Sequence, residues 1–429
     1  MNYLIGKKIN NSNDDKKSKT FLIIGIILNL ACLGVFKYAN FIIENINYLS
    51  PIFKFSLIKN PGIVLPIGIS FYTFQAISYI IDVYRGEVKV QNKFTDLALY
   101  ISFFPQLIAG PIIRYKTIEL QLKNRKSNWL NLEIGIKRFT LGLFKKVIIA
   151  NQFGAIADVA FKMSGAELNS SNAWIGIIAY TVQIYFDFSG YSDMAIGLGR
   201  MLGFHFPENF NFPYIAKSIR EFWQRWHITL SDWFRSYLYF PIGGNRKGSS
   251  RTIINLLFVF FATSIWHGAS WNFVIWGITH GFFMVIERVG FAKILTHLWT
   301  PFQHIYTLLI IMFTWVFFKA DGFNHGVEYI SSLCNFNFGE VNFSFIQKMN
   351  SPMFICIFLI AIASCTKLPL KTVNLVNRII VKYSNHSVLK NSIQISYSFL
   401  ELVFIVSTLF FSTLFLIANS YNPFIYFRF

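Results

Sequence analysis

Three histidines stand in apolar or aromatic surroundings, where a titratable imidazole is rare. The stretch at 262–281 reads ATSIWHGASWNFVIWGITHG and contains His267 and His280, and His227 lies among aromatic residues nearer the N-terminus. A neutral imidazole is the side chain most often used to move a proton near pH 7. An isolated histidine in an apolar helix more commonly hydrogen-bonds a neighbouring carbonyl, so the local sequence has to separate the two roles.

His267 has the local sequence of a reactive group. It precedes three small residues, at 268–270, which would leave room for a substrate at a turn, and Trp266 and Trp271 flank it with stacking surfaces. We therefore predict that His267 is a general base. A metal site is not expected, because the chain has no HExxH spacing and no cysteine or carboxylate close by in sequence to complete a ligand set.

The elements that must position these histidines are membrane helices. Of the 429 residues, 54% are hydrophobic, 18% aromatic and only 14% charged, against roughly 25% charged residues in a soluble domain. Apolar residues come in blocks near the ~20 residues that cross a bilayer. The sequence predicts a single all-α integral membrane domain over residues 1–429, with about ten transmembrane or re-entrant helices and short interfacial helices. The candidate segments are 20–37, 63–82, 96–113, 134–161, 173–203, 252–268, 271–287, 303–319, 353–366 and 395–419.

One of these segments carries a signal against a continuous span. Residues 96–113 contain Pro105, Gly110 and Pro111. Because proline removes a backbone donor and glycine weakens a helix, we expect this segment to be broken or re-entrant.

The net charge of +19 fits membrane topology better than nucleic-acid binding, since Lys and Arg collect in cytoplasmic loops. Basic clusters lie at 7–19, 123–126, 217–251 and 367–382. If these clusters face the cytoplasm, the turn at 268–272 falls on the outer side. His267 would then lie near the outer end of its helix, and His280 deeper in the membrane.

Residues 206–251 form neither a clean span nor a polar loop. Aromatic residues alternate with charged ones, and Pro207, Pro213, Pro241 and a Gly-Gly pair interrupt the segment. Two interpretations fit equally well: an interfacial helix with an aromatic belt, or an amphipathic gate that admits an anionic substrate. In either case one helix face carries Ile219, Phe222, Trp223, Trp226 and Leu230.

Asp187 and Asp193 lie within the apolar run 173–203. Carboxylates at membrane depth usually face a partner, so we expect ion pairs that lock helices together, with Arg200, Arg220 or Arg225 as partners. Glycines 190, 197, 199 and 203 have no strand beside them and predict close helix packing instead of a nucleotide fingerprint.

Five motifs along the chain resemble the membrane-bound O-acyltransferase (MBOAT) family, most closely its bacterial branch with the alginate O-acetylation protein, the peptidoglycan O-acetyltransferases and the teichoic-acid D-alanylation transferase. The motifs are SFFPQLIAGPIIRY (102–115), FDFSGYSDMAIGLGRMLGF (186–204), NFNFPYIAKSIREFWQRWHITLSDWFRSYLYFPIGGNRKG (209–248), WHGASWNFVIWGITHG (266–281) and NPFIYFRF (422–429).

The resemblance implies a ring of helices around a thin centre, where a tunnel joins a cytoplasmic acyl-donor site to an acceptor site on the outer face. It implies that His267 is the main catalytic histidine and His227 the second, with His280 in a supporting role. The donor would be acetyl-CoA, used as a substrate with no bound cofactor, and its phosphates would meet Arg220, Arg225 or Lys247. Trp266 and Trp271 would line the substrate site.

The resemblance also implies a partner, a secreted or membrane-anchored acetyltransferase that completes delivery to an exported or cell-wall polysaccharide. Relatives begin with further hydrophobic helices before a segment like NYLIGKKI, which here starts at residue 3. The chain is therefore expected to lack about two of their helices. Two alternatives stay open: a transporter or flippase for a lipid-linked anionic precursor, and a non-catalytic scaffold subunit.

Overall fold

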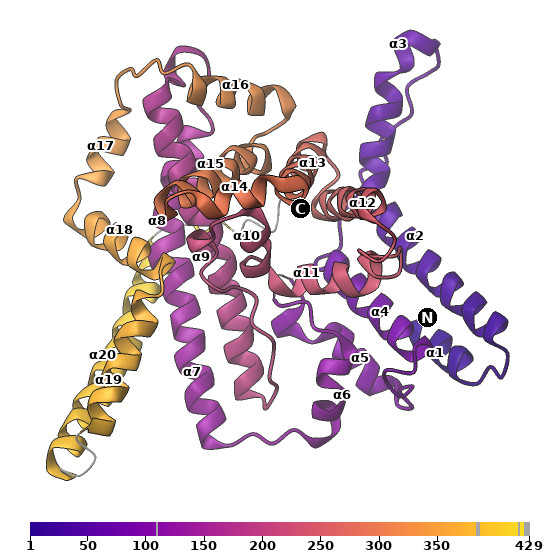
Figure 1. Ribbon diagram of the computed structural model, residues 1–429, viewed down its shortest axis with the longest axis horizontal. Coiled ribbons are helices and arrows are strands. Elements are labelled where there is room, and N and C mark those ends of the chain that lie inside the picture. The colour runs from indigo at the N-terminus through magenta and orange to yellow at the C-terminus, as the bar shows by residue number, and fades with distance from the viewer. Residues whose placement is uncertain (109, 383–386, 419–420, 424–429) are drawn as a thin grey trace.

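The computed structural model describes residues 1–108, 110–382, 387–418 and 421–423. Within these ranges all regular elements are helices and no strand occurs, which confirms the all-helical prediction. In Figure 1 the N-terminal helices lie on one side and α19 and α20 on the other, with α7 to α15 between them. The final motif, NPFIYFRF, lies outside the described residues from Phe424 onward.

The N-terminal part packs around α4 (Ile69–Tyr84), which is buried on nearly all sides. Helix α1 (Asn2–Asn10) and the long α2 (Asp15–Tyr48) pack against it, and α3 (Ser50–Phe53) projects beyond (Figure 1). Helix α2 begins where the Asp14 side chain accepts a hydrogen bond from the backbone of Lys16, a typical N-terminal cap. The apolar core here extends to Leu230, Trp233 and Trp266 from later in the chain.

The segment at 96–113 is broken, as predicted. Helix α5 (Phe94–Ser102) ends before Pro105, a short 3-10 turn η1 follows at Phe104–Gln106, and the next helix is α6 (Tyr115–Asn124). The prolines remove two backbone donors from this stretch, so a continuous helix would be interrupted in any case.

Helices α7 (Trp129–Leu143) and α9 (Ser170–Met201) pack at close range through glycines, which confirms the packing prediction. A π-helical turn, η2 (Phe144–Ala150), continues α7 into α8 (Asn151–Ala160). A side chain on Gly142 would come within 2.5 Å of the Gly190 carbonyl, and one on Gly197 within 2.7 Å of the Gly135 carbonyl. Only glycine permits this approach of two backbones.

The two aspartates of α9 form ion pairs, but with other partners than predicted. Asp187 pairs with Lys146 at 2.7 Å, and Asp193 pairs with Arg138 at 2.7 Å and with Lys145 at 2.6 Å. These cations come from α7 and η2, which already lie against α9 because of the glycine contacts. The expectation of helix-locking pairs holds, whereas the choice of partners was wrong for all three candidates, Arg200, Arg220 and Arg225.

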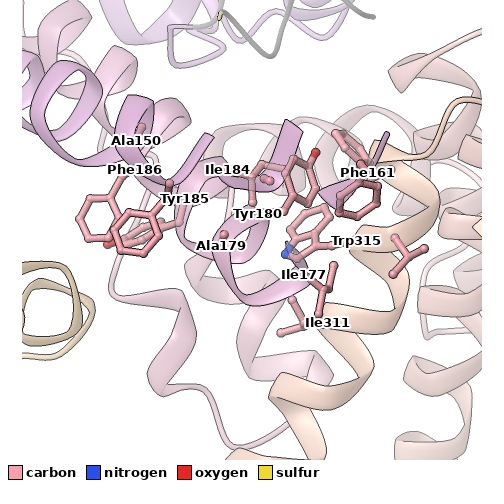
Figure 2. Close-up of a cluster of buried hydrophobic side chains, with 14 of the residues drawn as sticks. Ala150, Phe161, Ile177, Ala179, Tyr180, Ile184, Tyr185, Phe186, Ile311 and Trp315 are labelled. Carbon is pink, nitrogen blue, oxygen red and sulfur yellow. The ribbon is translucent and has the colours of Figure 1, made fainter. Parts of the chain in front are cut away.

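The central helices form a second apolar core. Figure 2 shows α9 side chains such as Tyr180 and Ile184 gathered with Phe161 and with Ile311 and Trp315 of α15. The remaining helices are α10 (Ile219–Arg225), α11 (Ile228–Phe234), η5 (Arg235–Tyr239), α12 (Ser249–His267), α13 (Trp271–Ile286), η6 (Glu287–Phe291), α14 (Ala292–His297), α15 (Thr300–Lys319), α16 (Phe323–Cys334), α17 (Phe343–Met349), α18 (Pro352–Cys365), α19 (Leu368–Lys382) and α20 (Ser387–Ala418), with 3-10 turns η3 (Gly165–Glu167) and η4 (Pro213–Ile215).

Five described helices are long and apolar enough to cross a membrane by length and composition, and the pair α17–α18, bent by 77°, would be a sixth. The five are Asp15–Tyr48, Ser249–His267, Trp271–His297, Thr300–Lys319 and Lys390–Ala418. The expected count of about ten spans is not confirmed and stays a prediction. Segments such as α9 carry buried ion pairs, so composition alone does not identify them as spans.

The glycine contacts between α7 and α9 yield a stability prediction. Gly197→Leu would place its first side-chain carbon 2.6 Å from the Phe139 amide nitrogen, and such overpacking costs about 1–3 kcal/mol of unfolding free energy. We expect a lower thermal midpoint in detergent by fluorescence-detected size exclusion. Gly34→Leu on α2 is the matched control, since the first carbon of a side chain at Gly34 would have no atom within 4 Å, and its midpoint should stay at the parent value. Equal midpoints for both variants would contradict the packing argument.

Candidate active site

His267 is the last residue of α12, and the local sequence explains why the helix ends there. Gly268 is extended (φ −171°), and a side chain at this position would lie 2.2 Å from the Phe273 ring. The chain therefore turns sharply, and Ser270 caps the start of α13 by accepting from the Asn272 amide. The small residues are needed at this turn, but the space beside Gly268 is filled by Phe273 and does not stay open for a substrate as expected.

The three histidines are brought together, and tryptophans separate them. Trp266 contacts the rings of His227 and His267, with centroid distances of 6.2 and 4.9 Å. Trp276 contacts His267 and His280 at 4.8 and 5.1 Å. Trp266 belongs to the N-terminal core and Trp276 to the central core, so His227 and His267 lie along the seam between the two. The described ring contacts of His280 are all with the central core.

Trp276 was not singled out by the sequence, although it lies one turn before His280 and on the same face of α13. Its proximity to a candidate histidine at this spacing was the available signal. Phe318, at the end of α15, also contacts His267, with ring centroids 5.4 Å apart. No sequence pattern connects residues so far apart, and only the fold reveals this contact.

His227 is fully buried and adopts a left-handed backbone conformation (φ 45°) between α10 and α11. Its Nδ1 lies 3.0 Å from Oδ1 of Asn209, which also accepts from the hydroxyl of Thr229. Because Oδ1 is an acceptor, Nδ1 of His227 donates the proton, and Nε2 of a neutral ring is left as an acceptor. This Nε2 has no hydrogen-bond partner among the described residues.

His280 has the opposite tautomer. The indole of Trp223 donates to Nδ1 of His280 at 3.3 Å, so Nε2 of the neutral ring carries the proton. His280 is fully buried, and this Nε2 likewise has no partner within the described part of the chain. The site therefore presents one buried acceptor, on His227, and one buried donor, on His280.

A small pocket of about 110 Å³ reaches His267. Lys37, Ser70, Gly68 and Trp266 contribute to its walls. Gly68 has φ +78°, and a side chain there would meet the Leu107 carbonyl at 2.3 Å, so the position requires glycine. Trp271 does not take part: it is 57% exposed, and its indole donates to Asn45 on α2 at 2.9 Å.

A much larger cavity, of about 1300 Å³, lies along the other end of α12. Its lining includes Ser249, Phe260 and Thr263 of that helix and Trp223 of α10. Thr263 precedes His267 by one helical turn, about 6 Å along the axis. The large cavity and the small pocket thus have lining residues one turn apart on α12, and Trp276 contacts both Trp223 and His267.

The large cavity has a surplus of cations, and Arg220 is one of the predicted residues that line it. Arg225 is not among the described lining residues: its guanidinium binds Glu221 at 2.7 Å and the Asn211 carbonyl at 3.0 Å. Lys247, in the loop before α12, is also absent from that lining. The cationic residues that do line the cavity are Lys217, Arg220, Arg235, Arg288 and Lys293, against the carboxylates Glu221 and Glu287.

The segment 206–251 supplies much of this cavity but does not lie flat on the surface. Many of its aromatic residues are buried, among them Phe222 and Trp226 in the central core, whereas Phe240 is 50% exposed. Two short helices, α10 and α11, occur here as expected, and the left-handed residue His227 separates them. The five residues expected on one face, Ile219, Phe222, Trp223, Trp226 and Leu230, are all buried.

Comparison with known proteins gives consistent relationships. Residues 92–320 match the membrane-bound O-acyltransferase family. The "probable alginate O-acetylase AlgI" of Azotobacter vinelandii is 43% identical over 348 residues, covering 81% of this chain and 69% of that protein. A peptidoglycan O-acetyltransferase of Helicobacter pylori is 35% identical over 414 residues, covering 85% and 78%. A teichoic acid D-alanyltransferase of Bacillus subtilis is 29% identical over 284 residues, covering 60% and 70%.

The family match includes helix α12, which contributes to the lining of both cavities. It also includes the segments that carry His227, His267 and His280. Together with the apolar helices and the bacterial relatives, it identifies a multi-pass protein of the bacterial inner membrane. The chain belongs to the membrane-bound O-acyltransferase family, in its alginate O-acetylation branch, and is an O-acyltransferase.

Proposed function

We propose that the protein takes an acetyl group from cytoplasmic acetyl-CoA and passes it across the membrane for O-acetylation of an exported or cell-wall polysaccharide. The observation that carries this proposal is the arrangement around α12, whose residues line a large cationic cavity and end at His267 in a small pocket. The nearest lining residues of the two spaces along α12, Thr263 and His267, are one helical turn apart. Such a short separation suits transfer of an acyl group from one side to the other, without movement of the polymer.

The large cavity has the charge expected of a site for acyl-CoA. Five cations and two carboxylates line it, and both carboxylates are already engaged within the protein. Glu287 accepts from the backbone amides of Ile219 and Arg220, and Glu221 pairs with Arg225. Arg235 pairs with Asp232 at 3.3 Å, and the other four cations are left to attract the phosphates of the donor. The basic character of their segment favours the cytoplasmic side.

His267 acts as the general base in this proposal. Its imidazole removes the proton of an acceptor hydroxyl, the oxygen attacks the thioester carbonyl carbon, and a carbon–oxygen bond forms as the carbon–sulfur bond breaks. The proton then passes to the leaving thiolate, which departs as the free thiol of CoA. A positioned base of this kind typically contributes about 10²–10⁴-fold to the rate.

The other two histidines are suited to complementary parts of this reaction. A buried N–H donor stabilises the oxyanion that develops on the thioester carbonyl oxygen, and Nε2–H of His280 is such a donor. The unprotonated Nε2 of His227 would accept a hydrogen bond from the hydroxyl or thiol. In this scheme Trp266 lines the acceptor pocket, and a secreted or membrane-anchored acetyltransferase receives the acetyl group on the outer side.

The base assignment is tested by His267→Ala. We expect acyl transfer to fall by about 10²–10⁴-fold, with normal amounts of protein in the membrane. The assay follows labelled acetyl-CoA inside proteoliposomes and label on an outer acceptor. His205→Ala is the matched control, since His205 is exposed in the loop after α9.

Retained transfer by His267→Ala would remove the base assignment. Movement of a lipid-linked sugar that needs no thioester would instead support the transporter hypothesis. Absence of both activities in the parent protein, with its partner acetyltransferase present, would support the scaffold hypothesis.

The donor site is tested by Arg220→Gln. We expect the KM for acetyl-CoA to rise about 10- to 100-fold, because one charge-assisted hydrogen bond to phosphate is worth about 1.5–3 kcal/mol. The kcat should change little, since the group acts far from the thioester. Arg378→Gln is the control, because Arg378 is exposed and belongs to α19, which lies at the edge of the molecule in Figure 1. A fall in kcat without a change in KM would contradict the assignment of Arg220 to donor binding.

A further inference from the structure

We propose that Lys37, assisted by Tyr38, is a positioning residue for acyl transfer, because the two side chains fix the last turn of α12 and thereby the backbone of His267. This inference rests on the proposed role of His267. It concerns α2, which precedes the stretch 92–320 matched by the family.

The end of α12 carries carbonyl groups that have no partner within the helix. In this protein all four are satisfied. The amide of Gly268 donates to Ser264, and the hydroxyl of Tyr38 donates to Ile265. The ammonium of Lys37 donates to the last two, the carbonyls of Trp266 and of His267, the latter at 3.2 Å.

The Lys37 ammonium is fully used by these contacts. Its third hydrogen bond goes to Oγ of Ser70 at 3.1 Å, and an ammonium has three donors. The side chain is only 9% exposed, although it borders the pocket at His267. Lys37 therefore has no donor left for a substrate, which argues for positioning and against substrate binding.

The same contacts join three helices at one point. Ser70 lies in the first turn of α4, and its carbonyl accepts from the indole of Trp266 at 3.3 Å. The Phe71 ring contacts Trp266, with centroids 5.4 Å apart. Lys37 on α2 thus connects the start of α4 to the end of α12, and the negative end of the α12 dipole faces its positive charge.

Fixing the backbone of His267 matters because a base works only at hydrogen-bond distance from its proton. A displacement of about 1 Å can lower a rate by about 10²-fold. Without the ammonium, two buried carbonyls at the catalytic turn would lose their donors, and the turn would shift to find others. The site would then keep its donor cavity but misplace its base.

The experiment measures kcat and the KM for acetyl-CoA per folded molecule, in proteoliposomes of the full chain. For Lys37→Met we expect kcat to fall about 10- to 100-fold with the donor KM within twofold of the parent. Tyr38→Phe removes one hydroxyl and should lower kcat about threefold or more. Lys19→Met, an exposed lysine on the same helix, is the control and should match the parent.

An unchanged kcat in Lys37→Met overturns the inference, as does a loss confined to the amount of folded protein. If Lys37→Met does not fold, the test rests on Tyr38→Phe, and an unchanged kcat per folded molecule in that variant overturns the inference. His267→Ala in the same assay distinguishes failure of the positioning role of Lys37 from failure of the proposed function. Inactive His267→Ala beside fully active Lys37→Met contradicts only the positioning role, whereas active His267→Ala contradicts the proposed function.

Discussion

A helix that ends inside a membrane protein has to satisfy its terminal carbonyls without water, because each unpaired group in an apolar interior costs several kcal/mol. This constraint determines the structure around His267. Helix α12 ends at a buried turn, and side chains from α2 reach its carbonyls. The requirement draws α2, α4 and α12 together, and the small pocket lies where they meet. The location of the candidate base therefore follows from hydrogen bonding of the backbone.

Buried charges follow the same rule elsewhere in the molecule. Asp187 and Asp193 on α9 are paired with lysine and arginine side chains of the preceding helix segment. Glu287 accepts from two backbone amides at the start of α10. The histidines differ, since His227 and His280 each keep one buried ring nitrogen without a described partner. Buried polar atoms without a described partner also occur elsewhere in the interior, for example on Gln75 and Gln183. At the histidines they coincide with the end of α12 and with the pocket at His267, and this coincidence favours a ligand site there.

The sequence was informative wherever the signal was local. Apolar blocks predicted the helices, Pro105 and Pro111 predicted the break in 96–113, and the glycines of α9 predicted a close helix contact. The turn after His267 was also predicted correctly, although Phe273 occupies the space that was expected to be open to a substrate. Contacts between distant segments were not readable. The predicted partners of Asp187 and Asp193 were wrong. Lys37, Trp276 and Asn209 were not predicted as site residues, because only tertiary packing brings them to these positions.

The contacts between histidine and tryptophan rings bear on whether protons could leak across the membrane through the site. A membrane potential of 100 mV is worth about 2.3 kcal/mol for each elementary charge that crosses. In the proposed function the site is reached from both faces, and such a site must not conduct protons. Trp266 and Trp276 separate the three imidazoles by ring contacts. A carbon ring neither accepts nor relays a proton, so these contacts leave no direct hydrogen bond between the described imidazoles. In the proposed function, the same rings that shape the site would also limit proton leakage through it.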